Sequence, residues 1–448
     1  MAVKIMEEPR ISVGVMEGRD LVGGRFNGLF SVEGARPVSG LFSAASDAGK
    51  VVLLDGEGRE AGRSASLRIA GRAGATFDLF RVTIGEGFHW EREEDHAFPG
   101  DLVLIAGKGG GVTVVNEVPV EDYLESVVAS EMSASAPVEF LKCHAILSRS
   151  WALSVIARKG RPQEAAASPS APSGGHEGEV VRWYGGEDHA LFDVCADDHC
   201  QRYHGLTRIT SEAVRAAVRE TRGTALTFGG EICDARYSKA CGGLTEEFGT
   251  AWADIAVPYL TCVPDGPAVY APITTEAQAA DWIGSRPDAY CNTQDEALLA
   301  AVLPAFDRET ASFFRWTVEY DRAELEEILR EKSGFDPGVL RAIEPLERGP
   351  SGRIRRLRIV GSRGARVVGK ELEIRRWLSR THLYSSAFTV RVFPAGSSAP
   401  ERFVLAGAGW GHGVGLCQIG AAVMASRGFS AGQIMAHYFP GAALSRLY

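Results

Sequence analysis

One stretch of the 448-residue sequence predicts its own local structure more clearly than any other, and it reads PVEDYLESVVASEM over residues 119–132. A proline is tolerated in the first turn of a helix, because the N–H that it lacks has no partner there. Five later residues recur at spacings of three and four, so they share one helix face. The pattern therefore predicts a helix with a carboxylate at the end of an apolar face. The five residues are Tyr123, Leu124, Val127, Val128 and Glu131.

The position of Glu131 at the C-terminal end of this face has a chemical consequence. Desolvation raises the pKa of a carboxyl group, and the negative end of the helix dipole acts in the same direction. A carboxylic acid that stays protonated near neutral pH is suited to general acid catalysis. The alternative is that Glu131 is the last polar residue of a fraying helix and points to solvent. The spacing alone does not decide between the two.

A second helix is predicted from Pro137 to about Arg158, and it is apolar on nearly all sides. A helix of this kind is normally buried. Arg149 within it then needs a partner for its charge, and Glu131 is one candidate.

The regions on either side of the two helices follow other patterns. From Arg10 to about Val115, short alternating runs between glycine-rich turns predict strands. Residues 163–179 are rich in Ala, Ser, Pro and Gly without periodicity, which predicts a surface loop. The last forty residues predict a glycine-rich turn and two short helices. The clearest strand runs are Ile11–Val15, Val51–Leu54, Phe77–Ile84 and Leu102–Ile105.

Residues 314–392 change pattern again and predict an inserted α+β subdomain. Its predicted strands lie around Trp316–Tyr320 and Ile354–Val360, and its predicted helices around Glu324–Lys332 and Leu372–Leu378.

Composition excludes several classes of protein. A net charge of −9 argues against a nucleic-acid partner, which favours a basic face. No apolar run reaches the roughly 20 residues that a transmembrane helix needs. Met1–Asp20 lacks the charged and then apolar pattern of a secretory signal peptide.

A cluster of metal-ligating residue types lies between Asp188 and His204. Three or four thiolate or imidazole ligands suit a tetrahedral zinc ion. The alternatives are a disulfide between Cys195 and Cys200, or two unpaired buried thiols. His199 and His204 are predicted to be surface residues rather than ligands. Cys233 and Cys241 flank a short predicted strand and receive no assignment.

Three ordered blocks of sequence resemble the stage II sporulation protein D family, also called the SpoIID/LytB family. The first runs from Val115 to Met132 and continues through Pro137 and residues 145–153. The second is DARYSKACGGLTE over residues 234–246, followed by Trp252 and residues 258–260. The third is GWGHGVGLCQIGA over residues 409–421, followed by residues 437–441. The resemblance extends from about Thr113 to the C-terminus.

This resemblance implies a peptidoglycan lytic transglycosylase that acts on glycan strands whose stem peptides have been removed. The catalytic acid of the family corresponds to Glu131, which the spacing singles out independently, and Arg149 is a second catalytic candidate. The protonated carboxyl would act on the bond between N-acetylmuramic acid and N-acetylglucosamine. A 1,6-anhydro sugar would form, so one carboxyl group suffices where hydrolytic glycosidases usually need two.

The resemblance also implies a zinc ion held by His189, Cys195 and Cys200, as scaffold or as catalyst. Block three of the family lines the substrate cleft. Its glycines let the backbone approach a ligand, while Trp410 can stack on a sugar and His412 and Gln418 can form hydrogen bonds. The alternative is a tight structural turn with Trp410 in the core. The spacing fits neither a dinucleotide fingerprint nor a P-loop. The predicted substrate-binding residues are Tyr237, Ser238, Gly242, Trp410, Gly411, His412, Gly413 and Gln418.

One departure from the family pattern and two alternative functions bear on these expectations. Cys241 stands where many members of the family have serine, which puts a hydroxyl contact there in doubt. Some members are described as amidase enhancers, so the alternative function is a glycan-binding protein that stimulates a cell-wall amidase. A zinc hydrolase ranks lower, because two thiolates make zinc a weaker Lewis acid than histidines do.

The expected fold is an α+β chain of two lobes around a substrate cleft. Residues 1–110 are expected to form a β-rich N-terminal domain. Residues 111–265 and 395–448 are expected to form the catalytic core, and residues 266–394 the inserted subdomain. The expected partners are glycan strands and a cell-wall amidase, and the expected location is extracytoplasmic, in the periplasm or cell envelope.

Overall fold

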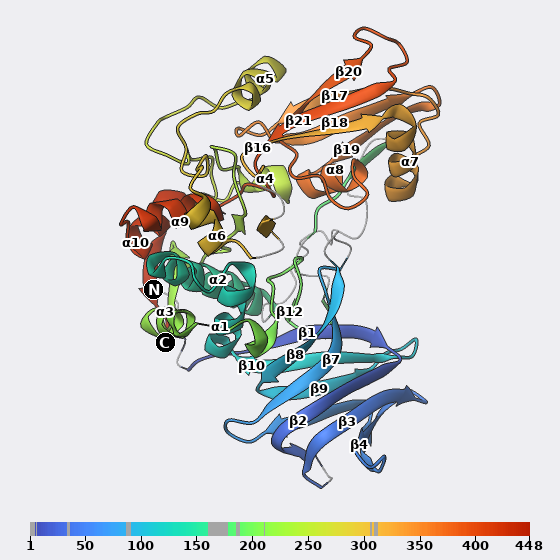
Figure 1. The fold of residues 1–448 in the computed structure, drawn as a ribbon, viewed down its shortest axis with the longest axis vertical. Coiled ribbons are helices and arrows are strands. Elements are labelled where there is room, and N and C mark those ends of the chain that lie inside the picture. The colour runs from blue at the N-terminus through green and yellow to red at the C-terminus, as the bar shows by residue number, and fades with distance from the viewer. Residues whose placement is uncertain are drawn as a thin grey trace. The chain divides into compact units, whose positions relative to one another are not determined.

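The computed structural model describes residues 5, 7–33, 36–86, 91–159, 178–184, 189–209, 211–304, 307–308 and 312–448. The chain divides into two compact units, each with its own sheets and helices (Figure 1). The fold is mixed α+β with a β-rich N-terminal region, as the sequence predicts. The first unit contains Met1–Pro162, Gly186–Asp234 and Leu444–Tyr448, and the second contains Gln163–Gly185 and Ala235–Ala443.

One large sheet dominates the first unit. Its strands follow the order β12-β1-β10-β9-β6-β2-β3-β4-β5, and β7 pairs with β2 and β8. Alternate residues point inward, so that Phe77 and Leu79 in β7 are fully buried around half-buried Asp78. The four predicted runs lie in β1, β4, β7 and β9, which confirms them. The strands are β1 (Arg10–Arg19), β2 (Leu21–Val32), β3 (Val38–Asp47), β4 (Lys50–Asp55), β5 (Glu60–Ser64), β6 (Ser66–Gly71), β7 (Thr76–Ile84), β8 (Arg92–Pro99), β9 (Asp101–Ala106), β10 (Val112–Pro119) and β12 (Val194–Cys195).

The helices of the first unit follow directly from β10. The helix α1 begins at Val120, immediately after Pro119, and its predicted apolar face is buried. The helix α2 buries residues on every side between Phe140 and Val155, as predicted. The bounds are α1 (Val120–Glu131), α2 (Val138–Lys159), the 3-10 helix η2 (Gly205–Arg208), α3 (Glu212–Glu220), and the small strands β13 (Thr224–Phe228), β14 (Glu231–Ile232) and β23 (Ala443–Arg446).

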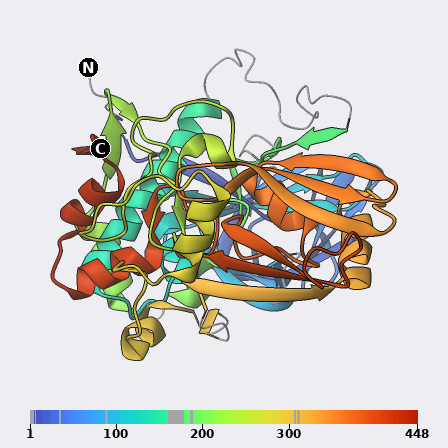
Figure 2. The ribbon, with the colours of Figure 1, turned by 90° about the horizontal axis from the view of Figure 1, so that it is seen from above.

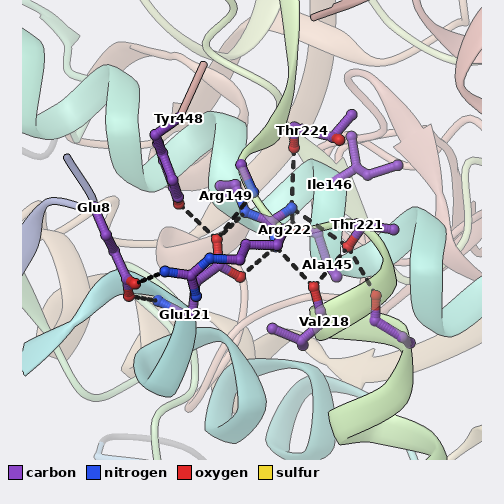
Figure 3. A network of polar contacts seen from close by, with 12 residues as sticks. Glu8, Glu121, Ala145, Ile146, Arg149, Val218, Thr221, Arg222, Thr224 and Tyr448 are labelled. Carbon is purple, nitrogen blue, oxygen red and sulfur yellow. Dashed lines mark hydrogen bonds and ion pairs between the residues drawn. The ribbon is translucent and has the colours of Figure 1, made fainter. Parts of the chain in front are cut away.

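A buried ion pair joins α1 to α2. Arg149 has no exposed surface, and its Nε and Nη2 donate to the two oxygens of Glu121 at 2.9 and 2.7 Å. Nη1 also donates to the carbonyl of Thr224 at 2.9 Å. Glu121 accepts further hydrogen bonds from the amide of Gly223 and the hydroxyl of Tyr448 (Figure 3). One charge pair therefore fixes two helices, the turn after α3 and the C-terminus.

The predicted pairing of Arg149 with Glu131 is wrong. Glu121 lies near the start of α1 and Glu131 at its end, so the two carboxylates are ten residues apart. At about 1.5 Å per residue, this separates them by about 15 Å along the helix. Arg149 reaches only the earlier one, where the carbonyls of Val218 in α3 and Thr224 at the start of β13 supply further acceptors.

The second unit holds two small sheets around one shared core. The order β11-β19-β18-β17 forms one sheet and β16-β21-β20 the other, and α7 and α8 pack beside them (Figure 1). Figure 2 shows these strands from a second direction, with β11 in green and the later strands in orange to red. Both predicted strands and both predicted helices of residues 314–392 are present, in β16, β18, α7 and α8. The strands are β11 (Glu179–Val181), β15 (Tyr237–Ser238), β16 (Arg315–Asp321), β17 (Leu340–Arg348), β18 (Ile354–Gly361), β19 (Gly364–Gly369), β20 (Phe388–Phe393), β21 (Arg402–Ala408) and β22 (Leu416–Cys417).

The remaining helices of the second unit are short. The two helices predicted near the C-terminus are present as α9 and α10, each eight or nine residues long. The bounds are α4 (Phe248–Ala251), α5 (Glu276–Gly284), α6 (Glu296–Val302), α7 (Arg322–Ser333), α8 (Glu371–Trp377), α9 (Gln418–Ser426) and α10 (Ala431–Tyr438).

The observed units do not follow the predicted segment boundaries. The strand β10 pairs with β1 beyond residue 110, and β21 pairs with β16 and β20 across residue 394. Strand pairing is long-range, so local composition does not reveal it. The predicted loop at residues 163–179 lies outside the described residues apart from 178 and 179. Among the helices that are described, none combines the length and apolar character required to cross a membrane.

Replacing Glu121 with Gln is expected to lower the free energy of unfolding by about 3–5 kcal/mol, because Arg149 then keeps a buried charge without its partner. Burial alone would raise the pKa of Glu121, but the hydrogen bonds and charge of Arg149 outweigh it and hold that pKa below its ordinary value. The wild-type contribution is therefore present above the ordinary carboxyl pKa and is lost as pH falls through the lowered pKa. Urea unfolding followed by circular dichroism across that pH range measures both effects.

The matched control is Glu125→Gln on the same helix. Its carboxylate lies 3.4 Å from the half-exposed Arg215, so the expected loss is below about 1 kcal/mol. Equal losses in the two variants would contradict the assigned role of the buried pair.

Candidate functional site

Glu131 is the last residue of α1, and it is buried with 8% of its surface exposed. Its Oε1 accepts a hydrogen bond of 2.9 Å from the backbone N–H of Arg202. The alternative of a frayed, solvent-exposed glutamate is therefore wrong. A carboxylate held by a backbone amide has a fixed orientation, which is what an acid or base acting on one bond requires.

The segment that presents this amide also contacts α1 at two other points. The hydroxyl of Tyr123 donates to Oε1 of Gln201 at 3.0 Å, and the N–H of His204 donates to the hydroxyl of Ser130 at 3.3 Å. Residues 201–204 are all buried. This short segment therefore lies along α1 from Tyr123 to its C-terminal end and holds Glu131. Sequence reasoning missed Arg202, because a backbone donor leaves no signal in residue type.

The predicted metal ligands lie together just before this segment. One ligand atom from each of His189, Cys195, His199 and Cys200 lies within 4.8 Å of the other three. Nε2 of His189 is 3.3 Å from Sγ of Cys200, and Nδ1 of His199 is 3.5 Å from the same sulfur. The hydrogen bond from Cys200 lowers the pKa of the Cys195 thiol, with the two histidines acting in the same direction.

Two elements position this cluster. Cys195 is held by β12, which pairs in parallel with β1 through Gly14. Cys200 follows a turn in which its N–H donates to the carbonyl of Asp197. No disulfide joins Cys195 to Cys200 in this structure. The donor set of two thiols and two imidazoles fits tetrahedral zinc.

The two further histidines differ from their predicted roles. His199 is exposed, as predicted. Its ring nitrogen nevertheless belongs to the cluster, a membership that the sequence pattern did not predict. Its position next to Cys200 was the available signal. His204 is buried and stacks on His96 at 5.3 Å, so its prediction as a surface residue is wrong. Burial lowers the pKa of His204 well below its ordinary value, which keeps the ring neutral.

The second unit brings two of the resembling blocks into contact. The strand β15 pairs in parallel with β22, so Tyr237 lies opposite Leu416 and Ser238 opposite Cys417. An isolated bridge joins Ala240 to Trp410 in the antiparallel sense. The predicted substrate-binding residues of the second unit therefore lie on two adjoining segments, although they are about 170 residues apart in the sequence.

A buried arginine explains two of the alternating glycines. Arg353 has no exposed surface and donates to the carbonyl oxygens of Gly411 and Cys241 and to the hydroxyl of Ser351. A Cβ atom on Gly413 would lie 2.3 Å from Cζ of Arg353. Gly409 and Gly413 therefore make room for a structural arginine, whereas a Cβ on Gly411 would meet Ser238 and one on Gly415 would meet the backbone of Arg236. Gly409, Gly411, Gly413 and Gly415 all have positive φ, between 75° and 91°.

Two aromatic residues of the block are engaged with protein partners. Trp410 is half-buried, with ring centroids 4.9 Å from Phe313 and 4.4 Å from Tyr384. Nδ1 of His412 accepts the N–H of Val414 at 3.0 Å. Burial holds the pKa of His412 well below its ordinary value, so its ring is neutral.

The remaining predicted substrate-binding residues differ in their surroundings. The hydroxyl of Ser238 is buried and has no hydrogen-bond partner among the described residues. Gln418 is buried at the first turn of α9. Gly242 has a positive φ of 81° beside the backbone of Gly409. Glu131 and these residues belong to different compact units, and the predicted cleft stays a prediction.

Comparisons with known families cover both units. Residues 108–228 match the model of the family described as stage II sporulation protein. The match contains α1, α2 and the cysteine and histidine cluster. Residues 246–415 match a second family, described as a domain of unknown function (DUF8618).

Three curated relatives are similar over part of their length. The chain is 24% identical to the amidase enhancer of Bacillus subtilis over 51% of this chain and 32% of that protein. It is 27% identical to stage II sporulation protein D of the same organism, over 33% of this chain and 39% of that protein. It is 28% identical to an uncharacterized protein of Brachyspira hyodysenteriae, over 33% of this chain and 32% of that protein. The matched region thus spans less than two fifths of each relative.

Replacing Gly413 with Ala tests the turn around Arg353. The left-handed backbone costs about 1–2 kcal/mol for a residue with a Cβ, and the overlap with the guanidinium adds about 1–3 kcal/mol. The control is Gly428→Ala, where φ is +89° but nothing lies within 4 Å. We expect a larger loss of thermal stability for Gly413→Ala, measured by calorimetry. Equal losses would mean that Arg353 does not constrain the turn.

Proposed function

We propose that this protein is a peptidoglycan lytic transglycosylase with Glu131 as its general acid and base. The observation that carries the proposal is the buried carboxylate at the end of α1, held by the N–H of Arg202. It lies within the part of the chain that matches the stage II sporulation protein family. The family match supports a role in the cell wall. The buried carboxylate supports the specific cleavage reaction.

The chemistry needs one carboxyl group. Protonated Glu131 gives its proton to the oxygen that links N-acetylmuramic acid to N-acetylglucosamine, and the bond to the anomeric carbon breaks. The carboxylate that remains takes the proton of the muramic 6-hydroxyl, whose oxygen then bonds to that carbon. The products are a 1,6-anhydro-muramic end and a free N-acetylglucosamine end, and no water is consumed.

Arg149 is proposed as a positioning residue and not as a residue that touches the substrate. Its guanidinium forms an ion pair with Glu121, and its side chain is completely buried. By fixing the start of α1 it fixes the helix that ends in Glu131. The second unit would contribute glycan contacts through the two adjoining segments that carry Ser238 and Trp410.

The cluster in the first unit supports a structural zinc ion, with His189, Cys195 and Cys200 as ligands and His199 as the fourth. A bound zinc ion would neutralise the thiolates and stabilise the loop between Cys195 and Cys200. Two residues after that loop, Arg202 donates its N–H to Glu131. Two thiolates make zinc a poor Lewis acid, so we assign the ion to positioning rather than to catalysis.

A second candidate function is a glycan-binding enhancer of a cell-wall amidase. One observation favours it: the similarity to the amidase enhancer covers 51% of this chain, a larger share than the similarity to stage II sporulation protein D. An enhancer needs the glycan-binding residues but not the acid. Either function requires access to peptidoglycan, so we propose an extracytoplasmic location and no nucleic-acid partner.

The test is digestion of purified, peptide-stripped glycan strands, with the products identified by mass spectrometry. We expect anhydro-muramic ends from the wild-type chain and a loss of about 10²–10⁴ in rate for Glu131→Gln, because general acid catalysis contributes about that factor. The control, Glu125→Gln, lies on the same helix outside the buried end and should retain activity. Products that contain added water would exclude the transglycosylase. Binding without cleavage, together with stimulation of an amidase, would favour the enhancer.

Zinc analysis tests the cluster separately. Cys195→Ser and Cys200→Ser are each expected to lower the zinc content of the purified chain by one equivalent, measured by inductively coupled plasma mass spectrometry. Cys143→Ser is the control, because Cys143 is buried in α2 and lies outside the cluster. An unchanged zinc content in Cys200→Ser would exclude the proposed ligands.

A further inference from the structure

A second group of metal-ligating side chains lies in the second unit, and the proposed function does not use it. The ligand atoms of Cys241, Asp265, Cys291 and Cys417 all lie within 4.8 Å of one another, and all four residues are buried. We propose that these residues form a second metal site, which binds one structural Zn²⁺ ion through three thiolates and one carboxylate. This inference does not depend on the transglycosylase activity.

The sulfur distances favour one metal ion over the other uses of paired cysteines. Sγ of Cys241 and Sγ of Cys291 are 3.8 Å apart. Two sulfurs bound to one tetrahedral zinc at about 2.3 Å each lie about 3.8 Å apart. A disulfide needs about 2.05 Å. An iron–sulfur cluster spreads its protein ligands more widely than the 4.8 Å limit that contains all four atoms here.

Backbone and side-chain donors hold the ligands in place. Cys417 is the N-cap residue of α9, and its sulfur accepts the N–H of Cys241 at 3.2 Å. Oδ2 of Asp265 accepts the N–H of Cys291 at 2.8 Å, and Oδ1 accepts the hydroxyl of Tyr438. Such second partners orient metal ligands and are typical of metal sites. The carboxylate oxygens each keep a lone pair for a metal ion.

A cation would stabilise the charged forms of these four buried side chains. All four side chains are buried, with 0–3% of their surface exposed. An isolated carboxylate or thiolate at such a site is costly, since a buried charge needs a partner. A divalent ion supplies that charge at the centre of the group. The carboxylate packs closely against α9, because a Cβ on Gly420 would lie 2.1 Å from Oδ1 of Asp265.

The placement of the four ligands indicates what the ion stabilises. Residues 252–304 contain only the short helices α5 and α6, and the apolar cluster beside α5 is small, with Leu244, Ile273 and Ala279 as its buried members. Asp265 and Cys291 lie in this irregular segment, while Cys241 and Cys417 follow β15 and end β22. The ion would therefore attach the segment to the paired blocks that carry Ser238 and Trp410. A structural metal commonly replaces a missing core in this way.

The experiment measures zinc in the full-length chain by inductively coupled plasma mass spectrometry under native conditions. We expect two equivalents in the wild type, one in Cys291→Ser and one in Cys417→Ser. The decisive variant is the double substitution Cys195→Ser with Cys200→Ser, which leaves the second unit untouched and should retain one equivalent. Cys262→Ser is the control, because Cys262 lies in the same irregular segment but outside the four-ligand group.

Replacement of zinc by Co²⁺ gives an independent readout that does not require a mutated second unit to fold. In the double variant we expect the absorption bands of tetrahedral cobalt with sulfur-to-metal charge transfer. The proposal is overturned if the double variant holds no metal, or if intact-mass analysis finds a disulfide between Cys241 and Cys291. If only the first site fails to bind zinc, the wild type holds one equivalent that Cys291→Ser abolishes. That result would contradict the zinc of the proposed function and support the second site.

Discussion

The ion pair between Glu121 and Arg149 constrains the first unit more than any other interaction described here. A fully buried arginine must satisfy its charge and its donors, since breaking such a pair costs several kcal/mol. Glu121 provides the charge, and Val218 in α3 and Thr224 at the start of β13 provide carbonyl acceptors. The C-terminal Tyr448 completes the network. Segments that are remote in the sequence are thus held by one charge, and α1 starts from a fixed point.

The candidate catalytic residue depends on that constraint at one end of α1 and on a loop at the other. A helix is stiff, so fixing Glu121 restricts where Glu131 lies. The segment after the cysteine and histidine cluster then sets the orientation of the carboxylate through the N–H of Arg202. The physical role proposed for zinc in the first unit follows from this geometry, because an ion at the cluster would stabilise the segment that presents this donor.

The second unit also contains a buried arginine whose donors are satisfied by the surrounding residues. Arg353 is buried among backbone carbonyls and is accommodated by glycines in left-handed conformations. This turn brings the end of β22 beside β15, and it leaves Cys241 and Cys417 next to each other. The glycine pattern that resembles a ligand-binding loop is therefore explained at Gly413 by packing against an arginine. The hydroxyl of Ser238 in the adjoining strand is buried and has no hydrogen-bond partner among the described residues.

The sequence by itself determined the local elements and the acid candidate. The periodicity of residues 119–132 predicts α1 and its buried face, and the strand runs at Phe77–Ile84 and elsewhere are present, because side-chain alternation is a local property. Only the tertiary structure decided the pairings: Glu121 rather than Glu131 for Arg149, His199 within the first cluster, and four separated residues in the second. Apart from His199, which neighbours Cys200, these contacts join positions far apart along the chain. Composition and spacing carry no information on them, since long-range packing and charge burial select the partners.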